Sequence, residues 1–131
     1  MSRRASLNPT EAELEILSVL WRQGPSTVRE IHDILQLERS TTLTTTLKIL
    51  QLMTEKGLTH QDEGRPHRFT AVIAEEKTQA GLVKDLVKRA FDGSVRKLLV
   101  RAVEVGGMSA KELRDIQQLI DQVQKGKGKT K

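Results

Sequence analysis

The segment TLTTTLKILQLMTEKG, residues 42–57, constrains the fold more strongly than any other part of the chain. Thr42 predicts the N-cap of a helix, because its hydroxyl can accept a backbone N–H that the first helical turn leaves unpaired. Gly57 predicts the helix end, since glycine readily adopts the left-handed conformation that closes many helices. Between these ends, one face recurs at the helical spacing i, i+3, i+4 and i+7. Its residues are Thr46, Ile49, Leu50 and Met53.

The opposite face of this predicted helix is polar and carries two hydroxyls, one amide, one cation and one acid. Such side chains suit the phosphate backbone and the base edges in a DNA groove. An ordinary amphipathic helix with a solvated side fits this segment equally well, so the neighbouring segments decide between the two interpretations. The polar face comprises Thr44, Thr45, Lys48, Gln51 and Glu55.

Two shorter helices are predicted before this segment. Asn8 predicts the N-cap of the first, with Pro9 in its first turn and Glu11 completing a capping box. Trp21 lies on the apolar stripe of this helix, so we interpret it as a core residue. The second helix begins with the capping box Thr27-x-x-Glu30, carries an apolar face and ends near residue 37. With the turn at 38–41 and the helix of residues 42–56, it predicts a helix-turn-helix unit, whose last helix would enter the major groove.

After Gly57 the pattern changes to two short runs, residues 58–61 and 67–71, on either side of a glycine-containing loop. This pattern is typical of a two-stranded hairpin. Three helices followed by a hairpin with arginines at its tip predict a winged helix-turn-helix DNA-binding domain over residues 1–73. The wing spans about Leu58 to Ala71. The predicted DNA-binding residues are Thr42, Thr44, Thr45, Lys48, Gln51, Arg65, His67 and Arg68.

Three more helical segments follow, so the fold class is mainly α. They begin near Glu75, at the cap Ser94 and at the capping box Ser109-x-x-Glu112. Their apolar stripes are too wide for the small mass available to cover them. We therefore predict that residues 74–124 form a helical dimerisation region, and that residues 125–131 form a disordered basic tail. The predicted dimerisation residues are Leu82, Leu86, Phe91, Val95, Leu98, Leu99, Leu113, Ile116, Leu119 and Ile120.

The distribution of charge does not locate a binding surface. The formal charge is +5, but residues 1–74 contain nine basic and nine acidic side chains, so their balance is 9 − 9 = 0. Lysines of the tail supply most of the excess. Only a local arrangement can define a nucleic-acid site. The neutral balance leaves an alternative function, a winged-helix protein–protein adaptor without DNA binding. Arg3 and Arg4 of the N-terminal arm are more simply interpreted as part of a loose basic start.

Several classes of function are not supported by the residues present. The chain has no Cys, which excludes disulfides and thiolate metal sites and fits a reducing, cytoplasmic location. No apolar run reaches the roughly 18 residues of a membrane span, and the first residues do not resemble a secretory signal. His60 and His67 lie on opposing arms of the hairpin but lack further ligands, so we predict no metal or other cofactor. His32 is interpreted as a structural residue, and no catalytic grouping predicts an enzyme.

Five segments together resemble the BlaI/MecI/CopY family of penicillinase-type repressors. Each segment is weak alone, but the combination is specific and covers about residues 7–119. The segments are residues 14–17 with 20–21, residues 24–30, residues 44–48 with 53–58, residues 64–69, and residues 92–94 with 98–99.

The resemblance implies a cytosolic homodimeric repressor that binds a palindromic operator through its recognition helix and wing. Some members are inactivated when a membrane sensor peptidase triggers cleavage between their two regions. The corresponding bond here is Arg101–Ala102, where those members carry Asn–Phe, so the chain departs from the pattern at this bond. The copper-responsive members carry a cysteine cluster that this chain lacks. Thr46 replaces an aliphatic residue that is usual in the family.

Overall fold

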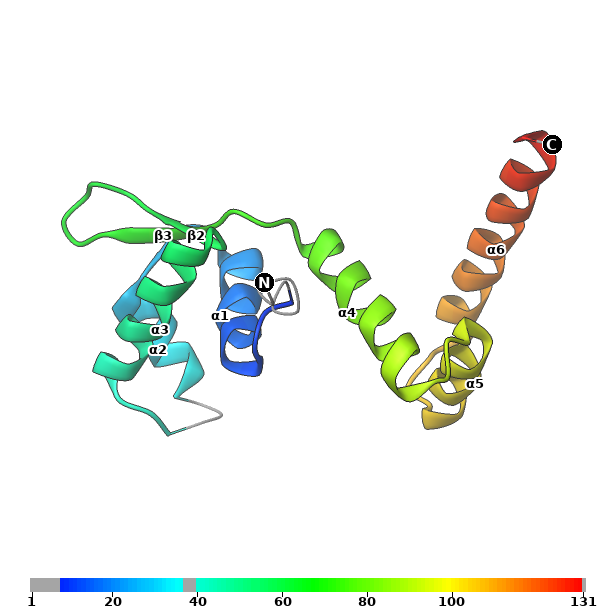
Figure 1. Cartoon of the computed structure of the whole chain (residues 1–131), viewed down its shortest axis with the longest axis horizontal. Helices are drawn as coiled ribbons and strands as arrows, with labels where there is room; N and C mark the ends of the chain where they lie inside the picture. The colour runs from blue at the N-terminus through cyan, green and yellow to red at the C-terminus, as the bar shows by residue number, and fades with distance from the viewer. Residues whose placement is uncertain (1–7, 37–39, 131) are drawn as a thin grey trace. The chain divides into compact units, whose positions relative to one another are not determined.

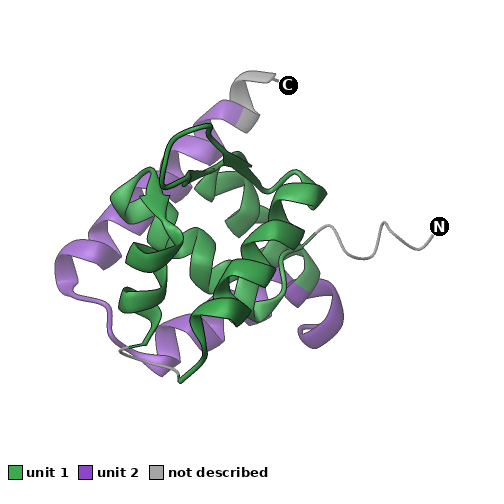
Figure 2. Ribbon diagram, turned by 90° about the vertical axis from the view of Figure 1, so that its left-hand side faces the viewer, with its two compact units in different colours: residues 1–85 green, residues 86–131 purple. Residues whose placement is uncertain are grey.

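The computed structural model describes residues 8–36 and 40–130, and the side chains of residues 8–36 and 40–126. The chain divides into two compact units, residues 1–85 and 86–131 (Figure 2). The predicted N-terminal arm with Arg3 and Arg4 lies outside the described residues. The same is true of residues 37–39, which include the predicted end of the second helix and the start of the turn after it.

Over residues 8–36 and 40–85, the first unit contains three helices and a small antiparallel sheet, followed by the first part of a fourth helix (Figure 1). The strand order is β1-β3-β2, so the central strand is the second strand of the hairpin. Ser26 pairs with Phe69, and His60 pairs with Thr70. The elements are α1 (Glu11–Gln23), β1 (Ser26–Thr27), α2 (Val28–Leu35), α3 (Leu43–Lys56), β2 (Thr59–Gln61), β3 (Arg68–Ala71) and α4 (Glu75–Ala90).

Local capping signals explain where α2 and α3 begin and end. Thr27 and Glu30 form the predicted reciprocal capping box at the start of α2. The Thr42 hydroxyl accepts the backbone N–H of Thr45 at 3.1 Å, and Gly57 closes α3 with a φ of 84°. These predictions are confirmed.

The predicted start of α1 is wrong by two residues. Thr10, not Asn8, is the N-cap, and its capping-box partner is Glu13 rather than Glu11. The Glu13 backbone N–H donates to the Thr10 hydroxyl at 3.2 Å, and the Thr10 N–H donates to the Glu13 carboxylate at 3.0 Å. Both candidate caps have the required spacing, and Glu13 of the observed cap also pairs with Lys56, a residue distant in the sequence.

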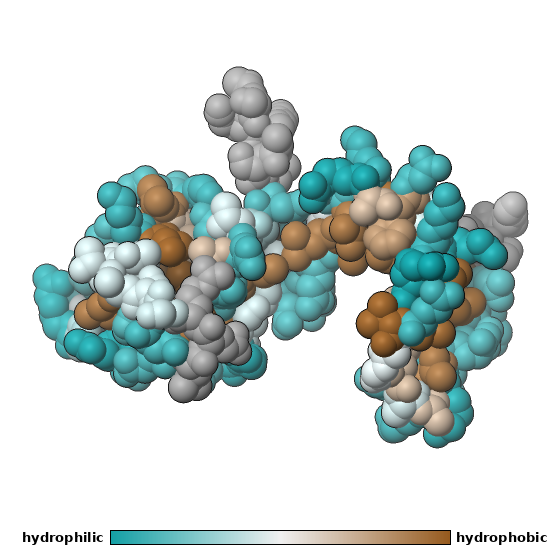
Figure 3. Space-filling view, turned by 90° about the horizontal axis from the view of Figure 1, so that it is seen from below, coloured by the Kyte–Doolittle hydropathy of each residue, from teal (hydrophilic) through white to brown (hydrophobic). Residues whose placement is uncertain are grey.

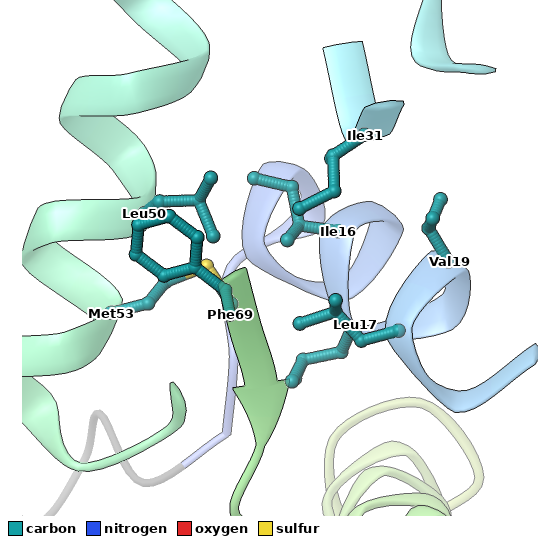
Figure 4. Packing of buried hydrophobic residues seen from close by; sticks show 8 residues of the cluster. Ile16, Leu17, Val19, Ile31, Leu50, Met53 and Phe69 are labelled. Atoms are coloured by element: carbon teal, nitrogen blue, oxygen red, sulfur yellow. The ribbon is translucent and has the colours of Figure 1, made fainter. Parts of the chain in front are cut away.

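The core of the first unit joins all three helices to the sheet. Phe69 of β3 lies in one buried cluster with side chains from α1, α2 and α3, and every member of the cluster is at most 3% exposed. Trp21 packs against this cluster and donates its indole N–H to the carbonyl of Ile73 at 3.0 Å. The prediction that Trp21 is a core residue is therefore confirmed. The cluster comprises Ile16, Leu17, Val19, Leu20, Ile31, Leu50, Met53 and Phe69 (Figure 4).

The second unit contains the end of α4, then α5 (Val95–Val105) and α6 (Ala110–Thr130). Ser94 caps α5, and Ser109 and Glu112 form the predicted capping box before α6. The sequence predicts a disordered tail from residue 125, whereas α6 continues to Thr130. The lysines of this segment favour a helix, and each glycine opposes it by only about 1 kcal/mol. Among the described residues, no helix is both long and apolar enough to cross a membrane.

A partly buried ion pair connects the start of α1 with the end of α3. The Lys56 ammonium lies 2.6 Å from the Glu13 carboxylate, whose side chain is only 6% exposed. Burial by itself raises the pKa of Glu13, but the hydrogen bonds from Lys56 and Thr10 and the charge of Lys56 outweigh it. The pKa of Glu13 therefore lies below its ordinary value, so the folded state binds this proton more weakly than the unfolded state.

We expect Glu13→Gln to lower the free energy of unfolding by about 1 kcal/mol near neutral pH. Glutamine preserves the capping box and removes only the charge. The loss is smaller than the ~3–5 kcal/mol of a fully buried pair, because solvent partly screens Lys56. The stability that Glu13 contributes is present above the pKa of the unfolded chain and is lost as pH falls through the lower folded pKa. Urea unfolding at several pH values measures both effects.

The matched control is Glu63→Gln, the same chemical change on an exposed loop residue of the same unit. This variant should retain the stability and acid sensitivity of the unaltered chain. Equal stability of the Glu13→Gln variant at every pH would show that the ion pair contributes nothing.

Candidate nucleic-acid interface

The predicted polar face of α3 is exposed along its length. Thr44, Lys48 and Gln51 are all exposed, and within residues 8–36 and 40–126 none of their three side chains has a hydrogen-bond or ion-pair partner. The opposite face places Leu50 and Met53 in the core with no measurable exposure. The structure therefore leaves three adjacent polar side chains of α3 available to an external ligand.

The other two predicted threonines, Thr42 and Thr45, form the N-terminal cap of α3. The Thr42 hydroxyl accepts the backbone N–H of Thr45, and the two hydroxyl oxygens lie 2.9 Å apart. Both side chains remain exposed. They shape the N-terminal end of α3, where unpaired backbone N–H groups and the helix dipole favour a negatively charged ligand.

A buried hydrogen bond fixes the N-terminal half of α3 against α2. The Thr46 hydroxyl, in a residue that is 1% exposed, donates to the Thr42 carbonyl at 3.3 Å. Its oxygen therefore accepts from Nδ1 of His32 at 3.1 Å, which assigns the imidazole proton to Nδ1. His32 is 8% exposed, so it is a buried structural histidine as predicted. Thr46 is suited to this face because it supplies an acceptor that an aliphatic residue lacks.

Asp62 organises the loop between β2 and β3. Its carboxylate accepts the backbone N–H groups of Arg68 at 2.8 Å and Gly64 at 3.1 Å. The backbone hydrogen bond from Arg68, and then that from Gly64, hold the pKa of Asp62 below its ordinary value. The sequence reasoning missed this role, although an aspartate two residues before a glycine is a known signal for a side-chain-bonded turn.

The three predicted wing residues have different surroundings. Arg65 is exposed, and one of its guanidinium nitrogens lies 3.0 Å from Nε2 of His67. The other imidazole nitrogen of His67 lies 2.7 Å from the Asp62 carbonyl. Arg68 lies 3.6 Å from the carboxylate of Glu30, so its charge is partly balanced within the domain. Glu30 was not expected from the sequence to contact the wing.

The two hairpin histidines, His60 and His67, have different surroundings. His60 pairs with Thr70 in the sheet, whereas His67 bonds within the loop. Among the described residues, no three His, Asp or Glu side chains gather closely enough to hold a metal ion.

Most of the predicted dimerisation residues are exposed within the chain. Leu82, Phe91 and Leu98 are half-buried, while α5 as a whole buries no residue. Arg101 and Ala102, which flank the predicted cleavage bond, are exposed in α5. The Arg101 guanidinium pairs with Glu104 at 3.1 Å. The exposed members of the predicted set are Leu86, Val95, Leu99, Leu113, Ile116, Leu119 and Ile120.

The helical core, the three-stranded sheet and the hairpin define a winged helix-turn-helix protein, which confirms the predicted fold class. The chain belongs to the penicillinase repressor family, whose sequence model matches residues 9–122. This membership confirms the resemblance noted from the sequence.

Three known proteins illustrate the similarity. The chain is 36% identical over 108 residues to the transcriptional regulator BlaI of Mycobacterium tuberculosis, covering 79% of this chain and 78% of that protein. It is 23% identical over 116 residues to the penicillinase repressor of Bacillus licheniformis, covering 86% and 89%. A crystal structure of a MarR family transcriptional regulator from Silicibacter pomeroyi DSS has a TM-score of 0.48 and 20% identity, covering 94% of this chain and 74% of that one. Both sequence relatives are named as regulators and neither as an enzyme.

We expect Thr46→Val to lower the free energy of unfolding by about 1–3 kcal/mol, because the buried N–H of His32 loses its acceptor. Adding His32→Leu removes the second polar partner and should recover much of this loss. The exposed control Thr44→Val should change stability by less than about 0.5 kcal/mol. Urea unfolding measures all three. A Thr46→Val protein at least as stable as the unaltered chain would contradict the role of this hydrogen bond.

Proposed function

We propose that the chain is a homodimeric transcriptional repressor that binds a two-fold symmetric operator. In this proposal α3 enters the major groove, and the hairpin of β2 and β3 contacts the adjacent backbone. The observation that carries the proposal is the exposed polar face of α3, whose Thr44, Lys48 and Gln51 are not used within the domain. Membership of the penicillinase repressor family supports it.

The dimensions and chemistry of α3 suit this placement. Its 14 residues span about 21 Å at about 1.5 Å per residue, and the major groove is about 12 Å wide. Gln51 offers both a donor and an acceptor to a base edge, while Lys48 offers charge to a phosphate. These two side chains lie about one turn apart, so one face of α3 provides both a contact that positions the helix on the DNA backbone and a contact that recognises a base.

The exposed apolar surface of the second unit supports the dimer. Figure 3 shows apolar side chains gathered on the helices at the right of the view. The exposed leucines, isoleucines and valines of α5 and α6 include Leu99, 49% exposed, and Leu119, 59% exposed. Exposed apolar side chains gathered in this way are typical of an association surface. A two-fold dimer would present two copies of α3 to the two halves of a palindromic site.

The alternative function, a protein adaptor without DNA binding, follows from the neutral charge balance of residues 1–74. It requires no exposed cation on α3, yet Lys48 lies in the centre of the exposed polar face. DNA binding is therefore the better-supported function. DNA-binding measurements on the unaltered chain and on a Lys48→Gln variant distinguish these two functions.

Release from the operator by a sensor-linked protease would require cleavage between Arg101 and Ala102. This bond is exposed but lies within the regular hydrogen bonding of α5. Helical backbone must open locally before a protease can reach it.

We expect Lys48→Gln to weaken operator binding by about five- to tenfold at moderate salt. Loss of one phosphate contact should also reduce the slope of log affinity against log salt by about 1. The measurement is fluorescence anisotropy, over a range of salt concentrations, on a duplex selected from random DNA with the unaltered chain. The control Lys77→Gln makes the same change on exposed α4 of the same unit and should bind normally.

Unchanged affinity and salt slope for Lys48→Gln would overturn the assignment of α3. Failure of the unaltered chain to select any duplex would favour the adaptor.

We expect Leu99→Glu to convert the dimer to a monomer, because it places an unpaired charge in the proposed apolar interface. Light scattering coupled to size-exclusion chromatography measures the mass directly. The control Gln118→Glu adds the same charge at an exposed polar position of α6 and should remain dimeric. A Leu99→Glu protein that keeps the dimer mass would show that this face is not the interface.

A further inference from the structure

A chain of hydrogen bonds in the wing determines where the proton of His67 lies. Nδ1 of His67 is 2.7 Å from the carbonyl oxygen of Asp62, which can only accept, so Nδ1 carries the proton. Nε2 is 3.0 Å from Arg65, whose guanidinium has only donors, so Nε2 is the acceptor. The geometry therefore requires the neutral imidazole with its proton on Nδ1.

This arrangement uses both nitrogens of His67 inside the wing. The sequence placed His67 among the DNA-contacting residues, but neither nitrogen is left over for DNA in this geometry. Half-buried His67 instead lies between the loop backbone and the exposed guanidinium of Arg65.

We propose that His67 is a positioning residue that holds Arg65 ready for a phosphate of the DNA backbone. This inference rests on the proposed DNA-binding function and assigns a role within the same site. The guanidinium has five donor N–H groups and uses one on His67, so the remaining groups can reach phosphate oxygens. A flexible arginine loses rotamer freedom when it binds, and prior positioning reduces that loss.

Arg68, the second arginine of the wing, has a partner of a different kind from that of Arg65. Arg68 lies 3.6 Å from the carboxylate of Glu30, whose charge partly cancels its own. Arg65 is held by a neutral ring, so it is positioned without loss of its net charge. The wing therefore has one arginine paired with an acid and another presented as a full cation.

Two substitutions separate the two bonds of His67. Asparagine places an amide near the position of Nδ1 and preserves the bond to Asp62, but it has no acceptor at the position of Nε2. Glutamine places an acceptor near the position of Nε2 and preserves the bond to Arg65. We expect His67→Asn to bind a selected operator duplex about three- to tenfold more weakly than the unaltered chain. His67→Gln should recover most of the affinity.

The dependence on Arg65 is tested in a double-mutant cycle measured by fluorescence anisotropy. In an Arg65→Gln background, His67→Asn should cause little further loss, because the residue being positioned is absent. Thermal unfolding of each variant establishes that the domain is folded. Nitrogen NMR shows, in the absence of DNA, which imidazole nitrogen of His67 carries the proton. We expect a protonated Nδ1 and an unprotonated Nε2.

Three results would overturn the role of His67. The first is that the His67→Asn and unaltered proteins bind the duplex with equal affinity. The second is that His67→Asn lowers the affinity by the same factor whether residue 65 is arginine or glutamine. The third is an imidazole that carries its proton only on Nε2. If the unaltered chain selects no duplex at all, the proposed function fails together with this inference. If it selects one and any of the three results is found, only the positioning role fails.

Discussion

The orientation of α3 depends on two polar contacts near its ends, one buried and one partly buried. Thr46 accepts a hydrogen bond from His32 of α2, and Lys56 pairs with Glu13 of α1. Between them, apolar side chains of α3 fill the core. Hydrophobic contact alone is non-directional, whereas these two polar contacts have defined partners and geometry. They fix the rotation of α3 about its axis, and that rotation determines which side chains remain exposed.

The sequence predicts those parts of the fold that depend on neighbouring residues. The caps at Thr27 and Thr42 and the end at Gly57 are local hydrogen-bonding arrangements, and the structure confirms all three. The start of α1 was misplaced because Glu13 is selected by Lys56, which lies 43 residues away. Strand β1 was missed because two residues carry no periodic pattern, and it exists only through pairing with β3.

In the candidate site, too, the sequence predicts features set by local spacing but not the partners of individual side chains. Helical spacing was sufficient to identify the outward face of α3, because the apolar face determines its opposite. It was not sufficient to distinguish the two wing arginines. Arg68 is balanced by Glu30 of α2, whereas Arg65 contacts His67 two residues further along the loop, and His67 is itself bonded to Asp62. A sequence shows that both are cations but does not show their partners, so the difference in available charge emerges only from the tertiary structure.

The stability of the second unit is limited by how little of its helical surface is buried within the chain. Helix α5 has 11 residues and buries none of them within the chain. A helix of this length is marginal in water without tertiary packing. In the proposed dimer, the partner would supply that packing, so folding of residues 86–131 and association would be linked. Linked folding makes stability depend on protein concentration. A cut in α5 would then remove the dimer and, with it, the paired presentation of α3 to the operator.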